Sequence, residues 1–121
     1  MSAQQLAGTG ALFDAPFYRQ VLPDRVTQEC KRREGHVPAV KLQLMDGREL
    51  DLCHVLHLGD RWLAVQHFRD LSTCEDMDLT FLPYEAVITV TISMHAPGER
   101  RAGFMADRPA GAGLPAPAGV R

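Results

Sequence analysis

The chain of 121 residues has little of what several classes of protein need. It has only three cysteines, Cys30, Cys53 and Cys74, and this odd number at irregular spacing favours reduced thiols over a disulfide framework. No apolar run approaches the roughly 20 residues of a membrane-spanning helix. Residues 1–17 lack the basic segment and the long apolar stretch of a secretory signal. We therefore expect a cytoplasmic protein that does not enter a membrane.

The sequence also lacks an excess of positive charge, since its formal net charge is −2. This balance excludes a strongly basic nucleic-acid-binding protein, although it leaves room for a local basic patch. The charges are unevenly spread. Residues 36–95 hold four basic and nine acidic side chains, a net charge of −5, whereas residues 1–35 carry +1 and residues 96–121 carry +2. The predicted core is therefore acidic and its flanks are basic.

Length and composition predict one domain with short appendages. Residues 96–121 are rich in Ala, Gly, Pro and Arg and offer few apolar side chains to offset the entropy of ordering, so we expect a disordered tail there. Residues 1–13 are small and polar, and we expect them to form a flexible N-terminus. The folded domain is expected to span residues 14–95.

One helix is expected before the strands. Pro23 and Asp24 are typical of a helix start, and Gly35 is typical of a helix end. The basic run of residues 31–33 falls in the last turn, where cations complement the helix dipole. A shorter helical turn is predicted to begin at Asp14, whose side chain can cap it.

From residue 40 the apolar residues alternate with a period of two, which predicts strands. Five are expected, over residues 40–44, 49–58, 61–67, 79–81 and 88–94. Five short strands with one apolar face each cannot bury those faces in an open sheet. The expected fold class is therefore mostly β, with an N-terminal helix followed by a small, strongly bent, five-stranded antiparallel barrel.

Two turns set the pairing of the first three strands. A three-residue loop with Gly47 in the left-handed conformation places Leu42 opposite Leu50, whereas a two-residue loop would place carboxylates among the leucines. The second turn is expected at residues 59–60, where glycine comes first. This turn would pair Leu58 with Arg61 and point one face of residues 49–58, which includes Leu56, into the core.

Three segments in this order resemble the Sm-like (LSm) superfamily. They are Val40-x-Leu42-x-Leu44-Met45-Asp46-Gly47, Trp62-Leu63-x-Val65 and Tyr84-Glu85-Ala86-Val87-Ile88. Within the superfamily the chain is most similar to the Hfq family of bacterial RNA chaperones. Asp14-Ala15-Pro16-Phe17 resembles the start of the helix in that family, and Arg33-Glu34-Gly35-His36-Val37-Pro38 resembles its entry into the first strand.

The resemblance implies a barrel that assembles edge to edge into a homo-oligomeric ring, a hexamer or heptamer, and binds RNA in and around the pore. The family carries a basic pair just before the alanine that corresponds to Ala86, but here Tyr84 and Glu85 stand at that place. The candidate RNA contacts are therefore the basic helix end and two aromatic residues: Lys31, Arg32, Arg33, Trp62 and Tyr84.

Each candidate also has a simpler interpretation. The three cations can serve only the helix dipole, and Trp62 and Phe68 can pack against a neighbouring subunit. The leading hypothesis is a ring-forming Sm-like protein that binds single-stranded RNA weakly and in a salt-sensitive way. The alternative is a ring of the same fold that has lost RNA binding and serves as a scaffold for another protein.

Histidines and cysteines also cluster in the sequence, which is the composition of zinc sites. The cluster comprises Cys53, His54, His57, His67 and Cys74. Neighbours on a strand point to opposite faces, so these side chains do not converge, and the same argument opposes a Cys53-His54 nucleophile. We expect no metal, no cofactor and no enzymatic activity.

Overall fold

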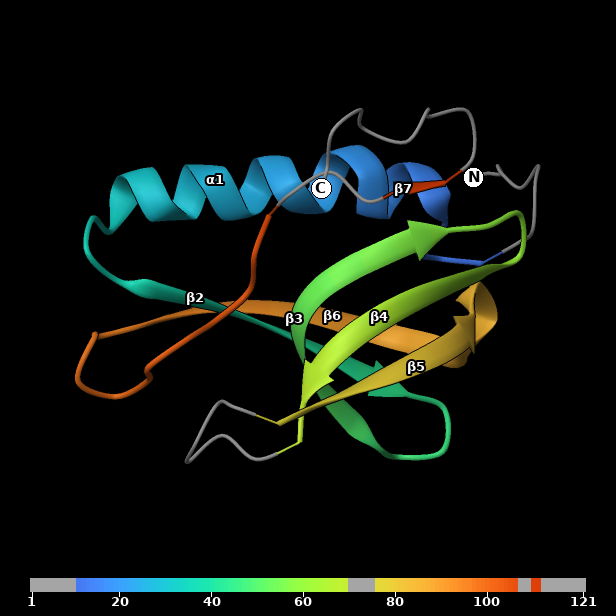
Figure 1. Ribbon diagram of the computed structural model, residues 1–121. Coiled ribbons are helices and arrows are strands. Elements are labelled where there is room, and N and C mark those ends of the chain that lie inside the picture. Colours follow the sequence, from blue (N-terminus) through green and yellow to red (C-terminus); the bar gives the residue numbers. More distant parts are fainter. Residues whose placement is uncertain (1–10, 70–75, 107–109, 112–121) are drawn as a thin grey trace, which may run out of the picture.

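Figure 1 shows the computed structural model, which describes residues 11–69, 76–106 and 110–111. A helical segment comes first and antiparallel strands follow, so the predicted fold class is confirmed. The helical segment consists of the π-helix η1 (Phe17–Val21) and the α-helix α1 (Leu22–Arg32). The strands are β2 (Val37–Leu44), β3 (Glu49–Leu58), β4 (Trp62–Phe68), β5 (Met77–Pro83), β6 (Val87–His95) and the short β7 (Ala110–Gly111), with a 3₁₀ turn η2 (Tyr84–Ala86) before β6.

The helical region begins earlier than the sequence predicts, because the turn at Asp14 and the main helix form one continuous segment. The cap is confirmed: the backbone N–H of Phe17 donates to Oδ1 of Asp14 at 3.3 Å. Pro23 has no N–H to donate within the helix, and the wider turns of η1 precede it. Gly35 has a φ of +83°, so its predicted role at the helix end is also confirmed. Among the described residues, no helix is both long and apolar enough to cross a membrane.

The five long strands form one bent sheet in the order β5-β4-β3-β2-β6, so β5 and β6 are its two ends. In Figure 1, β3 curves strongly, and the helical segment lies across one side of the sheet. Side chains from the helix and from both halves of the sheet meet in one buried cluster. Its members include Tyr18, Leu22, Val26, Val40, Leu42, Leu44, Leu52, Val55, Leu63, Val65, Leu82 and Val87.

The first hairpin forms as the sequence predicts. Leu42 lies opposite Leu50 and Val40 lies opposite Leu52. Gly47 has a φ of +92°, which a residue with a Cβ adopts only with strain. The chemistry of this loop therefore sets the register between β2 and β3.

The second hairpin differs from the prediction. A turn at residues 59–60 would pair Leu58 with Arg61, but Leu58 lies opposite Leu63. Because β4 begins at Trp62, the loop spans residues 59–61, and the predicted turn at residues 59–60 is wrong. At this end of the strands β4 is shifted by two residues from the predicted register, whereas at the other end Leu52 lies opposite His67, as that register requires.

Two register shifts also interrupt β3, one between residues 52 and 54 and one between residues 55 and 57. Each shift changes the alternation of faces, because an extra residue on one strand moves the following side chains to the other face. Val55 and Leu58 are therefore buried, whereas Leu56, which we predicted to point inward, is partly exposed. The bulges also account for the strong bend of this strand.

The strands predicted at 79–81 and 88–94 are present as β5 and β6, but some of their apolar side chains face outward. Leu82 pairs with Leu63 and occupies the core, so Leu79 and Phe81 point away from it and are more than half exposed. At the start of β6 a register shift beside Leu44 places Val87 in the core and leaves Ile88 exposed.

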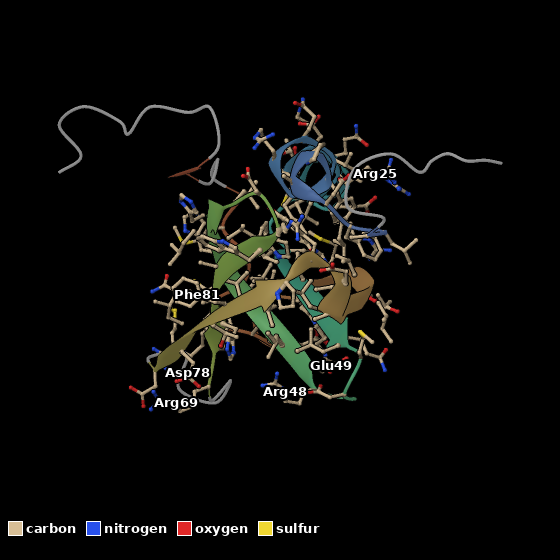
Figure 2. All side chains as sticks on the ribbon, turned by 90° about the vertical axis from the view of Figure 1, so that its right-hand side faces the viewer. Arg25, Arg48, Glu49, Arg69, Asp78 and Phe81 are labelled. Atoms are coloured by element: carbon tan, nitrogen blue, oxygen red, sulfur yellow. The ribbon has the colours of Figure 1, made fainter. Side chains whose placement is uncertain are left out.

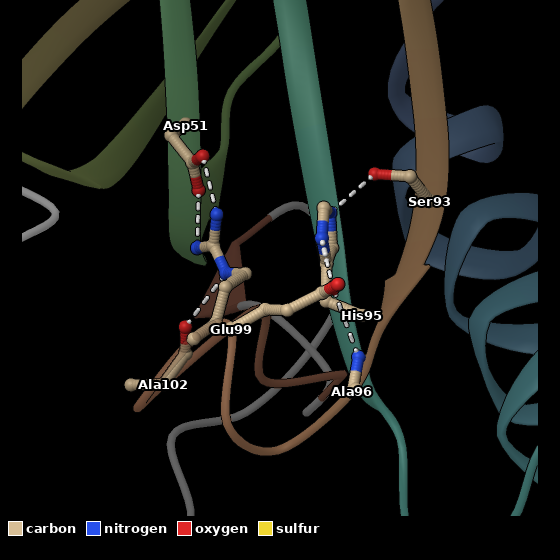
Figure 3. Close-up of polar contacts among 7 residues, drawn as sticks. Asp51, Ser93, His95, Ala96, Glu99 and Ala102 are labelled. Atoms are coloured by element: carbon tan, nitrogen blue, oxygen red, sulfur yellow. Dashed lines mark hydrogen bonds and ion pairs between the residues drawn. The ribbon is translucent and has the colours of Figure 1, made fainter.

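Residues 96–106 form a segment that we call the strap, which packs against the sheet. The guanidinium of Arg100 donates two hydrogen bonds to the carboxylate of Asp51, at 2.8 and 2.9 Å (Figure 3). Phe104 is only 6% exposed and belongs to the buried cluster. Its backbone N–H donates to the carbonyl of Pro38 at 2.9 Å, and the next N–H, from Met105, donates to the carbonyl of Cys53 at 2.7 Å. A disordered tail beginning at residue 96 is therefore wrong for the strap.

The strap has a physical reason to order. The register pairs of β2 with β3 end at Leu52, so the carbonyl of Cys53 has no partner on β2 and bonds to the strap instead. The remainder of the predicted tail, residues 107–109 and 112–121, lies outside the described residues except for β7. Residues 1–10 of the predicted N-terminus also lie outside them. Phe13, predicted to be flexible, packs on Phe17 with ring centroids 4.8 Å apart.

Candidate nucleic-acid interface

The end of α1 carries the three exposed cations that the sequence analysis singled out. Nη1 of Arg32 lies 3.2 Å from Oε2 of Glu29, so a carboxylate already offsets one of these charges. Within the described residues, Lys31 and Arg33 have no ion-pair partner. All three also lie near the negative end of the helix dipole. Two cations at this helix end are thus open to an anionic ligand.

Arg25 extends this basic surface and was missed by the sequence analysis. It lies seven residues before Arg32, which is two helical turns, and so shares the exposed face of α1 (Figure 2). Its guanidinium donates to the amide oxygen of Gln28 at 3.1 Å, and no carboxylate among the described residues neutralises it. The spacing of seven between the two arginines is the signal in the sequence that identifies it.

A second candidate surface lies on the outer face of β4 and β5. The indole of Trp62 is 40% exposed, and it stacks on the ring of His57 with centroids 5.1 Å apart and planes 22° apart. The ring of Phe81 is tilted by 58° to the indole, with the two centroids 5.7 Å apart. Figure 2 shows Phe81 pointing away from the sheet, and Leu79 shares its face of β5. We call His57, Trp62, Leu79 and Phe81 the aromatic patch.

The loop before β4 is shaped to hold this tryptophan. A Cβ on Gly59 would lie 2.6 Å from the indole of Trp62, which is closer than carbon atoms approach. Glycine at this position therefore lets the ring lie directly over the loop. The register shift before His57 contributes as well, because it turns this imidazole toward the same face.

Tyr84 is not an exposed stacking residue. Its side chain is 1% exposed, and its hydroxyl donates to the carbonyl of Gly59 at 2.7 Å. Its ring stacks on Tyr18, with centroids 6.1 Å apart. Burial raises the pKa of both phenols, so both stay neutral at physiological pH. Tyr84 joins the helical segment to the loop at residues 59–61, and its prediction as an RNA contact is wrong.

The residue after it, Glu85, is exposed in the turn η2. The carboxylate therefore stands at the surface where the resemblance implies a cation. An anionic group at this position repels a phosphate backbone.

The two candidate surfaces lie at opposite ends of α1. Tyr18, just before the helix, packs on Tyr84 beside the loop that carries Trp62. The cations follow at the other end of the helix, whose 11 residues span about 16 Å. Figure 1 shows the same separation, with the loop between β3 and β4 near the start of the helical segment and the helix end leading into β2. The single chain therefore does not gather the predicted RNA contacts into one site.

The ends of the sheet form a third surface of interest. β5 pairs only with β4 and β6 pairs only with β2 within the described residues, so each strand leaves one row of backbone groups without a partner. Leu79, Phe81 and Ile88 are exposed on these two strands. An exposed edge bordered by apolar side chains favours pairing with another strand.

The cysteines and histidines do not form a reactive site in the described part of the chain. No three His, Cys, Asp or Glu side chains there are gathered to hold a metal ion, and Cys74 lies outside it. Burial raises the pKa of the Cys53 thiol, which disfavours the nucleophilic thiolate. Nε2 of His67 lies 2.8 Å from Oγ1 of Thr80, and desolvation lowers the pKa of this imidazole. These contacts are those of core residues.

Comparisons of the chain with family models, with curated proteins and with solved structures find no match.

Proposed function

We propose that this protein is a ring-forming Sm-like protein of the cytoplasm, in which β5 of one copy pairs with β6 of the next and the ring binds single-stranded RNA weakly. The observation that carries the proposal is the pair of exposed edge strands at the two ends of one bent sheet. Pairing between copies would satisfy both rows of backbone groups at once, and it repeats until the ring closes. The order of helix and strands agrees with the Sm-like resemblance of the sequence motifs.

Assembly is tested by the mass of the protein in solution. Light scattering is expected to give six or seven copies of the 13.4 kDa chain, the sizes that the resemblance implies. Replacing Leu79 and Ile88 together with lysine places like charges on both edges and is expected to lower the mass. Val21→Lys, on the exposed side of the helical segment, is the control and is expected to leave the mass unchanged. A monomer at micromolar concentration for the unmodified chain would overturn the proposal.

RNA binding is proposed at the basic end of α1. The ring would repeat Arg25, Lys31 and Arg33 on one rim, and such a rim contacts phosphates without reading sequence. Changing residues 31–33 to alanine is expected to weaken binding of a short single-stranded RNA at least about tenfold, or about 1.4 kcal/mol. The dependence of binding on salt should become shallower, because fewer counterions are released.

A matched control removes cations that are already neutralised. Arg48 lies 2.9 Å from Asp46 and Arg69 lies 2.8 Å from Asp78, so replacing both arginines with alanine should change RNA binding much less. Glu85→Lys restores the cation that the resemblance implies and should tighten binding to uridine-rich RNA. Fluorescence anisotropy across a salt series measures all the variants.

The second candidate function is a protein-binding scaffold of the same ring. The exposed carboxylate of Glu85, the burial of Tyr84 and the distance between the basic helix end and Trp62 favour it. The anisotropy series distinguishes the two functions. If the unmodified protein does not bind RNA at low salt while Glu85→Lys does, the scaffold replaces RNA binding as the conclusion.

A further inference from the structure

The aromatic patch is an apolar surface without a cover in the described part of the chain. Leu79 and Phe81 are more than half exposed, and Trp62 is 40% exposed. Exposed apolar area costs about 25 cal/mol per Å², so adjoining side chains of this kind mark a surface that another segment covers. The patch faces outward from β4 and β5, away from the buried cluster.

The chain itself returns to this end of the molecule after the strap. β7 runs parallel to β3, with Ala110 beside His57 and Gly111 beside Leu58. Because the two strands are parallel, β7 runs in the same direction as β3, toward the loop of residues 59–61. That loop leads to Trp62, whose ring stacks on His57. Gly111, the last described residue, therefore lies at the end of β7 that is nearer to this loop.

The chemistry of residues 112–121 matches the patch. They read Ala-Gly-Leu-Pro-Ala-Pro-Ala-Gly-Val-Arg, with two prolines next to a leucine and a single cation at the end. Proline-rich segments favour the polyproline II conformation and bind to surfaces lined by aromatic rings. Exposed carboxylates flank the patch, since Asp60 lies in the loop before Trp62 and Glu85 lies just after β5. The charge of Arg121 complements them.

We propose that residues 112–121 dock on the aromatic patch of their own chain, with the segment Leu114–Pro117 against Trp62 and Phe81. In a polyproline II conformation, with about 3.1 Å per residue, Leu114 would lie about 9 Å beyond Gly111, within reach of the loop. β7 holds the chain beside β3 as far as Gly111, so the effective concentration of the residues that follow is of millimolar order at the patch. A weak contact is therefore enough to cover Trp62. The inference does not depend on the ring or on RNA binding.

The experiment uses Trp62, which is the only tryptophan of the chain, as its own reporter. Acrylamide quenching of its fluorescence is compared for the full chain and for a full-length variant with Leu114→Ser and Pro115→Ser. The variant should raise the quenching constant about twofold and shift the emission to longer wavelength, because the ring regains the exposure that docking removes. A variant with Ala112→Ser and Ala118→Ser changes the same segment without removing an apolar anchor, and it should behave as the unmodified chain.

A change on the patch tests the contact from the other side. The side chain of Phe81 is exposed, so Phe81→Ser should not unfold the domain. The change removes part of the docking surface. In this background the Leu114 and Pro115 changes should have a smaller effect on quenching, because the two sites act through one contact. Equal effects in both backgrounds would show that the segment does not bind at Phe81 and would overturn the proposal.

Other occupants of the patch give different results. If a second copy covers Trp62, the quenching constant changes when the protein is diluted and is the same with and without the Leu114 and Pro115 changes. If an RNA base covers it, quenching of the unmodified chain falls only when RNA is added. Either result overturns the proposal, as does the same quenching constant in the unmodified chain and the Leu114 and Pro115 variant.

Discussion

Phe104→Ala is expected to be among the most destabilising single changes in the strap. The ring is 6% exposed and lies in the same buried cluster as the strands, so its removal forfeits burial and leaves a cavity. Large-to-small changes of this kind cost about 3–5 kcal/mol. We expect the lower end, about 3 kcal/mol, because the strap is attached to the sheet on one side and can close around the cavity. In a domain of this size that loss lowers Tm by about 12 °C or more.

The assay is guanidinium denaturation followed by circular dichroism at one fixed protein concentration, because assembly would otherwise change the apparent stability. Met105→Ala is the matched control. Its side chain is 51% exposed, so its removal should change the free energy of unfolding by less than about 0.5 kcal/mol. If Phe104→Ala changes stability as little as the control does, the strap does not belong to the folded domain and the reasoning is refuted.

Three further predictions concern the strap and the tyrosines. Arg100→Ala should lower the free energy of unfolding by about 3 kcal/mol, because it leaves the carboxylate of Asp51 buried without its partner. Adding Asp51→Ala should recover part of this loss in the same denaturation assay. Gly103→Ala should lower Tm, because its Cβ would overlap the carbonyl oxygen of Pro38, and an unchanged thermal melt would contradict this placement. Stability should fall above about pH 10: the raised pKa values of Tyr18 and Tyr84 mean that the folded protein keeps protons that the unfolded chain releases there. The chain has only these two tyrosines, so phenolate absorbance should appear together with unfolding in an alkaline titration. Phenolate absorbance from the folded protein at pH 10 would contradict this prediction.

The first two hairpins show how far local sequence reaches. In the first, Asp46 and Gly47 fix the loop, and the apolar alternation on both sides agrees with only one register. In the second, the sequence predicts a two-residue turn that starts at Gly59. The actual role of this glycine is to admit the indole of Trp62, a contact that depends on where β4 lies. The register shifts in β3 have the same origin, because bending around a shared core selects them and the alternation of the sequence does not reveal them.

Of the candidate site, only the exposed cations at the end of α1 could be predicted from the sequence. Lys31 and Arg33 are exposed because they end an amphipathic helix, and this follows from the local pattern. Tyr84 has the composition of a stacking residue, but its burial depends on contacts with Tyr18 and Gly59, which are distant in the sequence. The aromatic patch was likewise not visible, since the outward direction of Phe81 follows from the pairing of Leu82 with Leu63.

The sequence by itself determined the order of helix and strands, the cap at Asp14, the helix end at Gly35 and the first hairpin, because each of these depends on interactions between residues close in the chain. The tertiary structure alone decided the bulges of β3, the outward face of β5 and the packing of the strap. The composition of the strap does not predict that it is ordered, because its few apolar and charged residues do not stabilise a fixed conformation by contacts with one another. They order because the sheet offers Phe104 a place in the buried cluster and offers Arg100 the carboxylate of Asp51, and these partners exist only once the strands have come together.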